Sequence, residues 1–442
     1  MTTLAISARP YSRHEGAVLR HTCRAVWQAD SLPAQAPDTT ATAAVPVPEP
    51  SALAIQYHRS SHVLWAGATG LELLVPGVLL FTGISARVRD LARRTARGRW
   101  LLTVAVYGAA YVLIQAIVFL PFAWYAGFVR QHAYGLSTET AGQWLADWAK
   151  ATAITAVVAA LVLWIPYRLL RASPRRWWLW TGFLTAPLTA LAMIVAPVWI
   201  APLFDQYGPM RDRALEARIH RLAARAGIPD SRIYEVRKSD ETRQVNAYVT
   251  GFGGTKRIVL WDTLVDRLGP DEVVFVMGHE IGHFVLRHTL TVILGTTLLV
   301  TLSLYVVHRV AGWSIARFHH RFGFGRLDDV ASLPLLALVG GAVMLVTTPA
   351  ALALSRWQER EADRFGLEIT RDNVAAARAL VRLHDENLAV PRTGLLYRLW
   401  RGSHPDLADR IEFSNRYRPW SHGDPLRYGD RFRSPEPLTP DP

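Results

Sequence analysis

Hydrophobic residues in this chain gather into six long runs, which polar and arginine-rich stretches separate. The runs cover residues 63–84, 101–129, 151–170, 177–204, 288–308 and 330–355. A helix needs about 20 mostly apolar residues to cross the hydrocarbon core of a bilayer, and each run reaches that length. We therefore expect a mainly α-helical, polytopic membrane protein with about six transmembrane helices.

The first apolar run contains one carboxylate, Glu72. An ionisable side chain inside a membrane span is costly, so it marks a functional site by default. A hydrogen bond to a neighbouring helix is the simpler explanation of the same residue. The sequence leaves both explanations open.

A soluble segment of residues 205–287 separates the fourth and fifth runs. Helical periodicity covers 212–226, and three strand-like segments follow at 232–236, 244–250 and 257–262. The segment Gly-Phe-Gly-Gly at 251–254 separates the last two and predicts a hairpin. Helical pattern resumes at Pro270, and after residue 283 no proline or strong breaker follows before Gly295. We expect a small α+β insert whose last helix continues into the fifth span.

The two ends of the chain are polar. Residues 29–54 are rich in Pro, Ala and Thr, and residues 1–60 hold no hydrophobic run, so we predict a disordered tail without a cleavable signal peptide. The expected organisation is a tail at 1–60, transmembrane helices at 61–204, a catalytic insert at 205–287, transmembrane helices at 288–355, a second catalytic part at 356–418 and a disordered tail at 419–442.

Composition agrees with a membrane protein and argues against a nucleic-acid partner. Half of the residues are hydrophobic and the formal net charge is +13. The positive charge is almost entirely arginine, with lysine at 150, 238 and 256 alone, and it is spread over loops and both tails rather than gathered in a stripe. Cys23 is the single cysteine, so no intramolecular disulfide can form.

The soluble segment carries a metal-ligand motif, His-Glu-Ile-Gly-His at residues 279–283. Residues four apart share a helix face, so His279 and His283 can bind one Zn²⁺, with Glu280 beside them as a general base. An exposed helix with two incidental histidines is the alternative. The mostly apolar residues 272–286 weigh against it, because buried histidines need partners. Gly278 and Gly282 cost helix stability and would let another backbone or a substrate come close.

A hydrolytic zinc site needs a third protein ligand. Leu286 and Thr289 replace the glycine and the third histidine of the extended HExxHxxGxxH motif, and Ser303 lies where a thermolysin-like glutamate would be. Glu359 is the best remaining candidate, with Asp363 one turn later as its neighbour on the same face. From the residues alone, an exposed helix start with ion pairs to nearby arginines explains these acids equally well. We assign Glu361 to such a surface role.

Several stretches, in order along the chain, resemble the CAAX prenyl protease 1 family of integral-membrane zinc metalloendopeptidases, to which the HtpX proteases are distantly similar. They lie at 200–207, 246–248, 256–263, 278–283, 355–363 and 403–410, within a resembling region of about 62–412. The resemblance implies one Zn²⁺ per chain, held by His279, His283 and Glu359, with Asp363 hydrogen-bonded to a ligand histidine.

The resemblance also implies roles that the residues alone do not suggest. Asn246, Ala247 and Tyr248 match the family's edge strand, onto which a substrate peptide would add. His404 matches its oxyanion-stabilising histidine and Arg410 the partner arginine. Two departures stand out. Gln244 and Val245 replace a common His-Ser pair, and a first span expected in eukaryotic members is missing.

We expect a membrane-embedded zinc metalloendopeptidase that cleaves membrane-associated or prenylated peptides. The alternatives are a quality-control endopeptidase of HtpX type and a zinc-binding membrane protein without catalysis. A site-2 type intramembrane protease would need an Asp-Gly ligand motif on a later span, which we do not find.

The side of the membrane is ambiguous from the sequence. Arginine-rich residues 87–99 and 168–176 favour a cytoplasmic location for those loops, which would place the insert outside. The family resemblance implies the opposite. Following the resemblance, we expect a multi-pass protein of a bacterial plasma membrane with its catalytic face in the cytoplasm.

Overall fold

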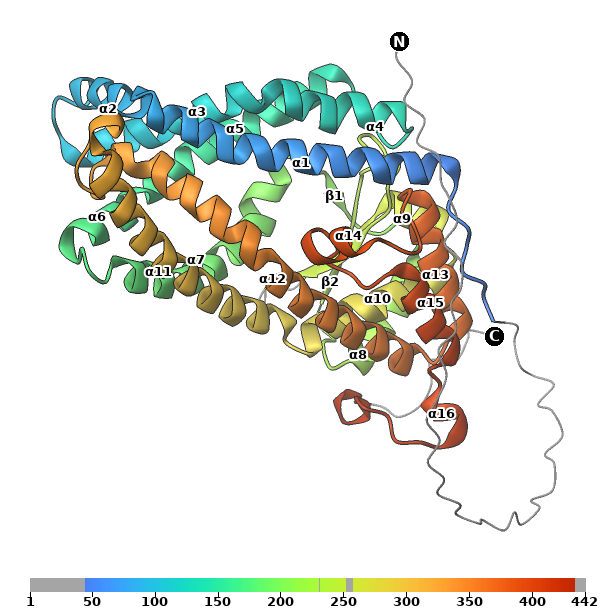
Figure 1. Cartoon of the computed structure of the whole chain (residues 1–442). Helices are drawn as coiled ribbons and strands as arrows, with labels where there is room; N and C mark the ends of the chain where they lie inside the picture. The colour runs from blue at the N-terminus through green and yellow to red at the C-terminus, as the bar shows by residue number, and fades with distance from the viewer. Residues whose placement is uncertain (1–43, 230, 252–256, 434–442) are drawn as a thin grey trace, which may run out of the picture. The chain divides into compact units, whose positions relative to one another are not determined.

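The computed structural model describes residues 44–229, 231–251 and 257–433, and all six expected membrane helices lie within them (Figure 1). The first half of the chain forms α1 (Ala52–Phe81), α2 (Ile84–Thr95), α3 (Trp100–Trp124), α4 (Arg130–Ala133), α5 (Ala141–Val162), α6 (Trp164–Ala172) and α7 (Trp177–Val195). The fifth and sixth spans are α11 (His288–Phe322) and α12 (Leu333–Thr370). The expected polytopic helical architecture is confirmed.

The soluble elements gather at one end of the spans, and the short helices α2 and α6 lie at the other (Figure 1). They are β1 (Tyr207–Gly208), α8 (Arg213–Arg225), β2 (Arg232–Val236), β3 (Ala247–Thr250), β4 (Arg257–Trp261), α9 (Asp262–Arg267), α10 (Pro270–Val285), α13 (Asn373–Glu386), α14 (Leu395–Trp400), α15 (Leu407–Arg416) and α16 (Pro419–His422). The predicted helix and the three predicted strands of the insert are all present, with slightly different bounds.

The strands form one small sheet in the order β1-β2-β4-β3. β2 and β4 are parallel, while β3 and β4 pair antiparallel as the predicted hairpin, with Tyr248 opposite Val259. Apolar residues of β4 and the helices behind it, including Ile258, Leu260 and Phe275, form the largest buried cluster. β3 lies at the edge of the sheet among the described residues.

The prediction that the metal-motif helix continues into the fifth span is wrong. α10 ends at Val285, and Arg287 adopts a left-handed conformation (φ 57°) before α11 begins at His288. A residue with positive φ interrupts the helical backbone, so α10 and α11 are separate helices. By contrast, α12 runs without interruption from the sixth span through Glu359.

The predicted tails are partly wrong as well. α1 begins at Ala52, where the Ser51 side chain accepts a hydrogen bond from the backbone N–H of Ala54, so the structured part starts before residue 60. The tail predicted from residue 419 contains α16 and a segment that packs on α12. Residues 1–43, with Cys23, and residues 434–442 lie outside the described residues.

Two buried carboxylates of α12 hold this C-terminal segment. Glu368 accepts hydrogen bonds from the backbone N–H groups of Arg427 (3.0 Å) and Tyr428 (2.8 Å), and the Tyr428 hydroxyl bonds Glu361. The surface role predicted for Glu361 is therefore wrong, because its charge is buried against Tyr428 and paired with Arg364 and Arg427.

Glycines allow α10 and α12 to pack almost backbone to backbone. A methyl group on Gly366 of α12 would lie 3.1 Å from the backbone nitrogen of His279, and one on Gly278 of α10 would lie 3.4 Å from the Cα of Gly366. Larger residues would force the helices apart. The close approach expected at Gly278 and Gly282 is therefore made by α12.

Replacing Gly366 with Ala should destabilise the protein by about 1–3 kcal/mol, because a backbone atom cannot move aside as a flexible side chain can. Thermal unfolding of the detergent-solubilised protein measures this effect. Gly340→Ala, on the same helix with no atom within 4 Å of the added methyl group, is the control and should not lower the melting temperature. Equal melting temperatures for both variants would contradict the packing argument.

Candidate metal centre

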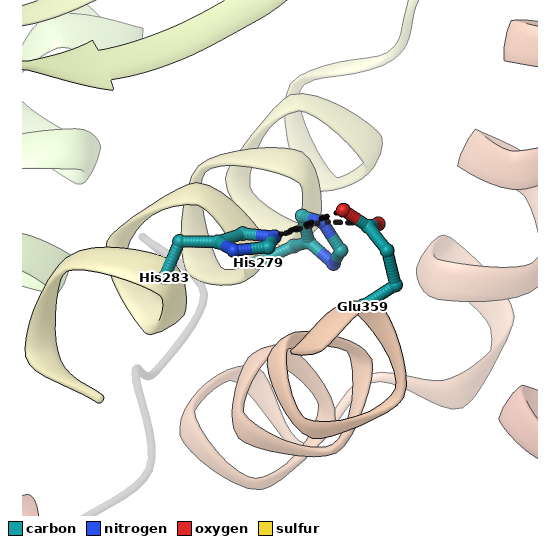
Figure 2. A group of neighbouring side chains, drawn as sticks. All are labelled: His279, His283 and Glu359. Carbon is teal, nitrogen blue, oxygen red and sulfur yellow. Dashed lines mark hydrogen bonds and ion pairs between the residues drawn. The ribbon is translucent and has the colours of Figure 1, made fainter. Parts of the chain in front are cut away.

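Two helices bring three potential metal ligands to one point (Figure 2). His279 and His283 lie one turn apart on α10, and Glu359 reaches them from α12. The two Nε2 atoms are 3.2 Å apart, and the Glu359 carboxylate oxygens lie 3.4 Å from that of His279 and 3.3 Å from that of His283. These ligand atoms all lie within 4.8 Å of one another.

The donor set fits a divalent metal ion. Two imidazole nitrogens and one carboxylate oxygen that converge with an open side are typical of catalytic zinc sites. The Oε2 atom of Glu359 is buried, at 3.4 Å from the Nε2 of His279 and 3.3 Å from that of His404. A buried carboxylate charge is costly unless it is compensated, and a cation at this point would compensate it.

The carboxylates of Asp363 and Glu359 create a negative electrostatic potential at His279. Desolvation acts to lower the pKa of this imidazole, but hydrogen bonds and charges from Asp363 and Glu359 outweigh it and raise the pKa to about 10. The same field that holds a proton would favour a metal cation in its place.

Asp363 and Arg410 form a second layer behind His279. The Nδ1–H of His279 donates to Asp363 at 2.9 Å, and Arg410 donates to both oxygens of the same carboxylate at 2.8 and 2.7 Å. All three residues are largely buried. This bidentate pair fixes the carboxylate, which leaves the Nε2 atom of His279 free to face the ligand cluster.

His288, which the sequence analysis did not identify, supports the other histidine. Its Nδ1 lies 3.0 Å from the Nδ1 of His283, and it is 4 % exposed at the start of α11. The Gln358 amide donates to its backbone carbonyl, which ties this turn to α12. A polar residue at the first position of an apolar run was the available signal. The left-handed turn at Arg287 brings His288 back to His283, which a continuous helix would not do.

Two further side chains face the same point from the open side. Glu280 follows His279 in the sequence and is half-buried. Burial raises the pKa of its carboxyl group, and the nearby His279 and His283 partly oppose this shift. The Nε2 of His404 lies 3.3 Å from Glu359, while more than half of the His404 side chain (55 %) is exposed. The backbone carbonyl of Ser403 accepts a hydrogen bond from Ser355 of α12, which anchors this loop.

An open cleft of about 460 Å³ adjoins these groups. The chain that leads into β3 and the loop that carries His404 both line it. Its apolar lining includes Leu264, Phe275, Val276, Leu380 and Leu383. A cleft with apolar walls and a few converging polar groups is typical of a binding site.

The three residues expected on the substrate strand differ in their surroundings. Asn246 and Ala247 line the cleft, and the Asn246 side chain accepts a hydrogen bond from the backbone N–H of Ala247 at 2.9 Å. The Tyr248 hydroxyl instead lies 3.2 Å from that of Tyr207. The structure therefore brings the first two to the cleft and turns the third side chain towards β1.

Comparison with known proteins agrees with this geometry. Residues 209–417 match the model of peptidase family M48, and residues 53–206 match the model described as CAAX prenyl protease N-terminal, five membrane helices. The chain belongs to peptidase family M48. It is a membrane metalloendopeptidase, and the resemblance inferred from its motifs is confirmed. Residues 53–206 contain four of the candidate spans found in the described residues, compared with the five in the family description.

Individual relatives cover most of the chain. An uncharacterized metalloprotease, YhfN, of Bacillus subtilis is 33% identical over 372 residues, which cover 83% of this chain and 86% of the relative. CAAX prenyl protease 1 of Saccharomyces cerevisiae is 28% identical over 315 residues, covering 67% and 69%. The fold is similar to the crystal structure of S. mikatae Ste24p, with a TM-score of 0.71 and 24% identity over 81% of this chain and 87% of that one.

Asp363→Asn should weaken metal binding by about 10- to 100-fold, because the ligand histidine loses its orienting carboxylate. Competition with a chelator of known affinity measures the change. Asp385→Asn on α13 is a matched control. The Asp385 carboxylate also lies 3.1 Å from a histidine nitrogen, but that histidine, His384, is not one of the three candidate metal ligands. Equal metal affinities in both variants would argue against the positioning role.

Proposed function

We propose that His279, His283 and Glu359 hold one Zn²⁺ per chain and that the adjoining cleft hydrolyses peptide bonds. The convergence of these three side chains beside an open cleft is the observation that carries the proposal. A bound zinc ion would supply Lewis acidity and lower the pKa of a water molecule. The catalytic parts at 205–287 and 356–418 thus act as one unit, although two spans separate them in the sequence.

The remaining roles fall to groups of the chain itself. The Glu280 carboxylate takes a proton from the attacking water and returns it to the leaving amine, for which a pKa raised by burial is favourable. His404 donates a hydrogen bond to the oxygen that becomes negative as the carbonyl is attacked. Asp363 and Arg410 keep His279 in one orientation throughout.

A substrate peptide would bind in extended form along β3. This strand has a neighbour on one side alone among the described residues, so Asn246 and Ala247 border both a free strand edge and the cleft. Peptides commonly add to such edges through main-chain hydrogen bonds, while side chains enter flanking pockets. The apolar residues near Phe275 and Val276 favour an apolar side chain in the cleft.

We further propose that the substrates are membrane-associated peptides, including prenylated ones of CAAX type. Soluble elements line the cleft, and they lie at one end of the membrane helices (Figure 1), where a lipid-anchored peptide would be concentrated. One relative is named CAAX prenyl protease 1, which supports this class. Peptide and lipid are the expected partners, and nucleic acid is not.

For the orientation, we propose a plasma-membrane location, in a bacterium, with the catalytic end in the cytoplasm, as the family resemblance implies. The arginine-rich residues 87–99 and 168–176 lie at the opposite end of the spans and favour the reverse. A protease added to intact spheroplasts should therefore leave a C-terminal tag uncut, and inside-out vesicles should expose it. Cleavage of the tag in spheroplasts would overturn the proposed orientation.

Glu280→Gln should retain zinc while peptide hydrolysis falls by about 10²–10⁴-fold, because the neutral amide cannot take the proton. Glu359→Gln is the comparison variant and should lose zinc as well as activity. Zinc content by mass spectrometry and turnover of a quenched fluorescent peptide distinguish the two. Wild-type turnover in Glu280→Gln would refute the assigned role.

The same assay separates the substrate classes. A farnesylated peptide and its unmodified counterpart, presented in the same detergent, should differ in kcat/KM in favour of the farnesylated form. Equal values would support a general quality-control endopeptidase instead. Bound zinc without turnover on any peptide would support a zinc-binding protein without catalysis.

A further inference from the structure

The free edge of β3 ends abruptly beside the active site. The backbone carbonyl of Asn246 accepts a hydrogen bond from the N–H of Trp261 at 3.1 Å, and Tyr248 lies opposite Val259 in the β3–β4 register. In an antiparallel pair, both main-chain groups of a residue point to the same side, and the sides alternate. Val245, Ala247 and Val249 therefore point their main-chain groups away from β4. The N–H of Ala247 donates to the Oδ1 of the preceding residue, Asn246, at 2.9 Å, a local contact that a bound peptide would replace.

Val245 is already paired on this outer side. Its N–H donates to the Oδ1 of Asn387 at 3.2 Å, and the Nδ2 of Asn387 donates back to the Val245 carbonyl at 3.3 Å. One side-chain amide thus satisfies both groups, as a residue of a neighbouring strand would.

Asn387 lies in the lining of the cleft. The residue caps the C-terminus of α13, and Leu380 and His384 of the same helix line the cleft with it. Both of these are nearly fully buried. Val245 and Asn387 line the same cleft as His279 and Glu280, so the end of the edge lies close to the catalytic groups.

We propose that Asn387 is a positioning residue that ends the substrate-binding edge at Val245. A bound peptide pairs with Ala247 and Val249, and it cannot pair beyond them towards Val245. This inference rests on the proposed function, because it concerns a peptide that adds to β3.

Such a stop would limit the length of substrate that the strand edge binds. The Asn387 amide occupies the next pairing position, so peptide residues beyond Ala247 on that side gain no main-chain hydrogen bonds to the edge. The number of substrate residues that contribute to binding on that side of the scissile bond is therefore fixed.

The test compares two asparagines that make the same contact. Asn415 pairs with the N–H and carbonyl of Val45 at 3.1 and 2.8 Å, as Asn387 does with Val245, but it is not among the residues that line the cleft. Asn387→Ala and Asn415→Ala are assayed with peptides that are lengthened one residue at a time on each side of the scissile bond.

In the wild type and in Asn415→Ala, kcat/KM should stop rising on one side once the peptide reaches the stop. In Asn387→Ala it should rise further, by about fivefold or more over the next two residues, because two new main-chain hydrogen bonds become available. A uniform loss at every length would overturn the proposal.

A second measurement uses the wild-type protein and does not depend on the folding of a variant. N-methylation of single peptide bonds in the substrate removes one donor at a time. Beyond the stop, methylation should leave kcat/KM unchanged, and losses there would overturn the proposal. If the wild type cleaves none of these peptides, the proposed peptidase function is refuted. If the wild type cleaves them and Asn387→Ala shows the same dependence on peptide length, only the proposed role of Asn387 is refuted.

Discussion

The close approach of α10 and α12 is the contact on which the rest of the active site depends. Gly278 and Gly366 let the two backbones come near enough that a methyl group on either would meet the other helix. Since one helix supplies imidazoles and the other supplies carboxylates, their separation sets the distance between His279 and both Glu359 and Asp363. A looser pair of helices would carry the same residues without forming the cluster.

The carboxylates of α12 require partners on more than one side, and the fold provides a different one for each. Glu359 faces the histidines, Asp363 binds Arg410, and Glu368 binds the backbone of the C-terminal segment. Burying a charge is costly unless it is paired. Each of these contacts joins α12 to a segment that is distant in sequence, so the charges that serve the chemistry also hold the soluble parts together.

Local patterns predicted the elements well and their connections less well. The six spans follow from hydrophobic length, and the β3–β4 hairpin follows from glycines between apolar strands. The break at Arg287 carries no proline or glycine signal, so the sequence indicated a continuous helix there. The folded conformation of residues 419–433 depends on hydrogen bonds to Glu361 and Glu368. The sequence does not show that these two acids are buried, because the C-terminal segment itself covers them.

By itself, the sequence determined the membrane spans, the helix that presents His279 and His283, and the residue types a metal-dependent hydrolase needs, because periodicity and length act over a few turns of chain. The tertiary structure decided which distant groups meet. It brought Glu359, which the family resemblance had indicated, to the two histidines. It alone turned His288 towards His283 and set Asn387 against Val245, 142 residues away. These contacts depend on packing between separate elements, and no local pattern specifies how such elements approach one another.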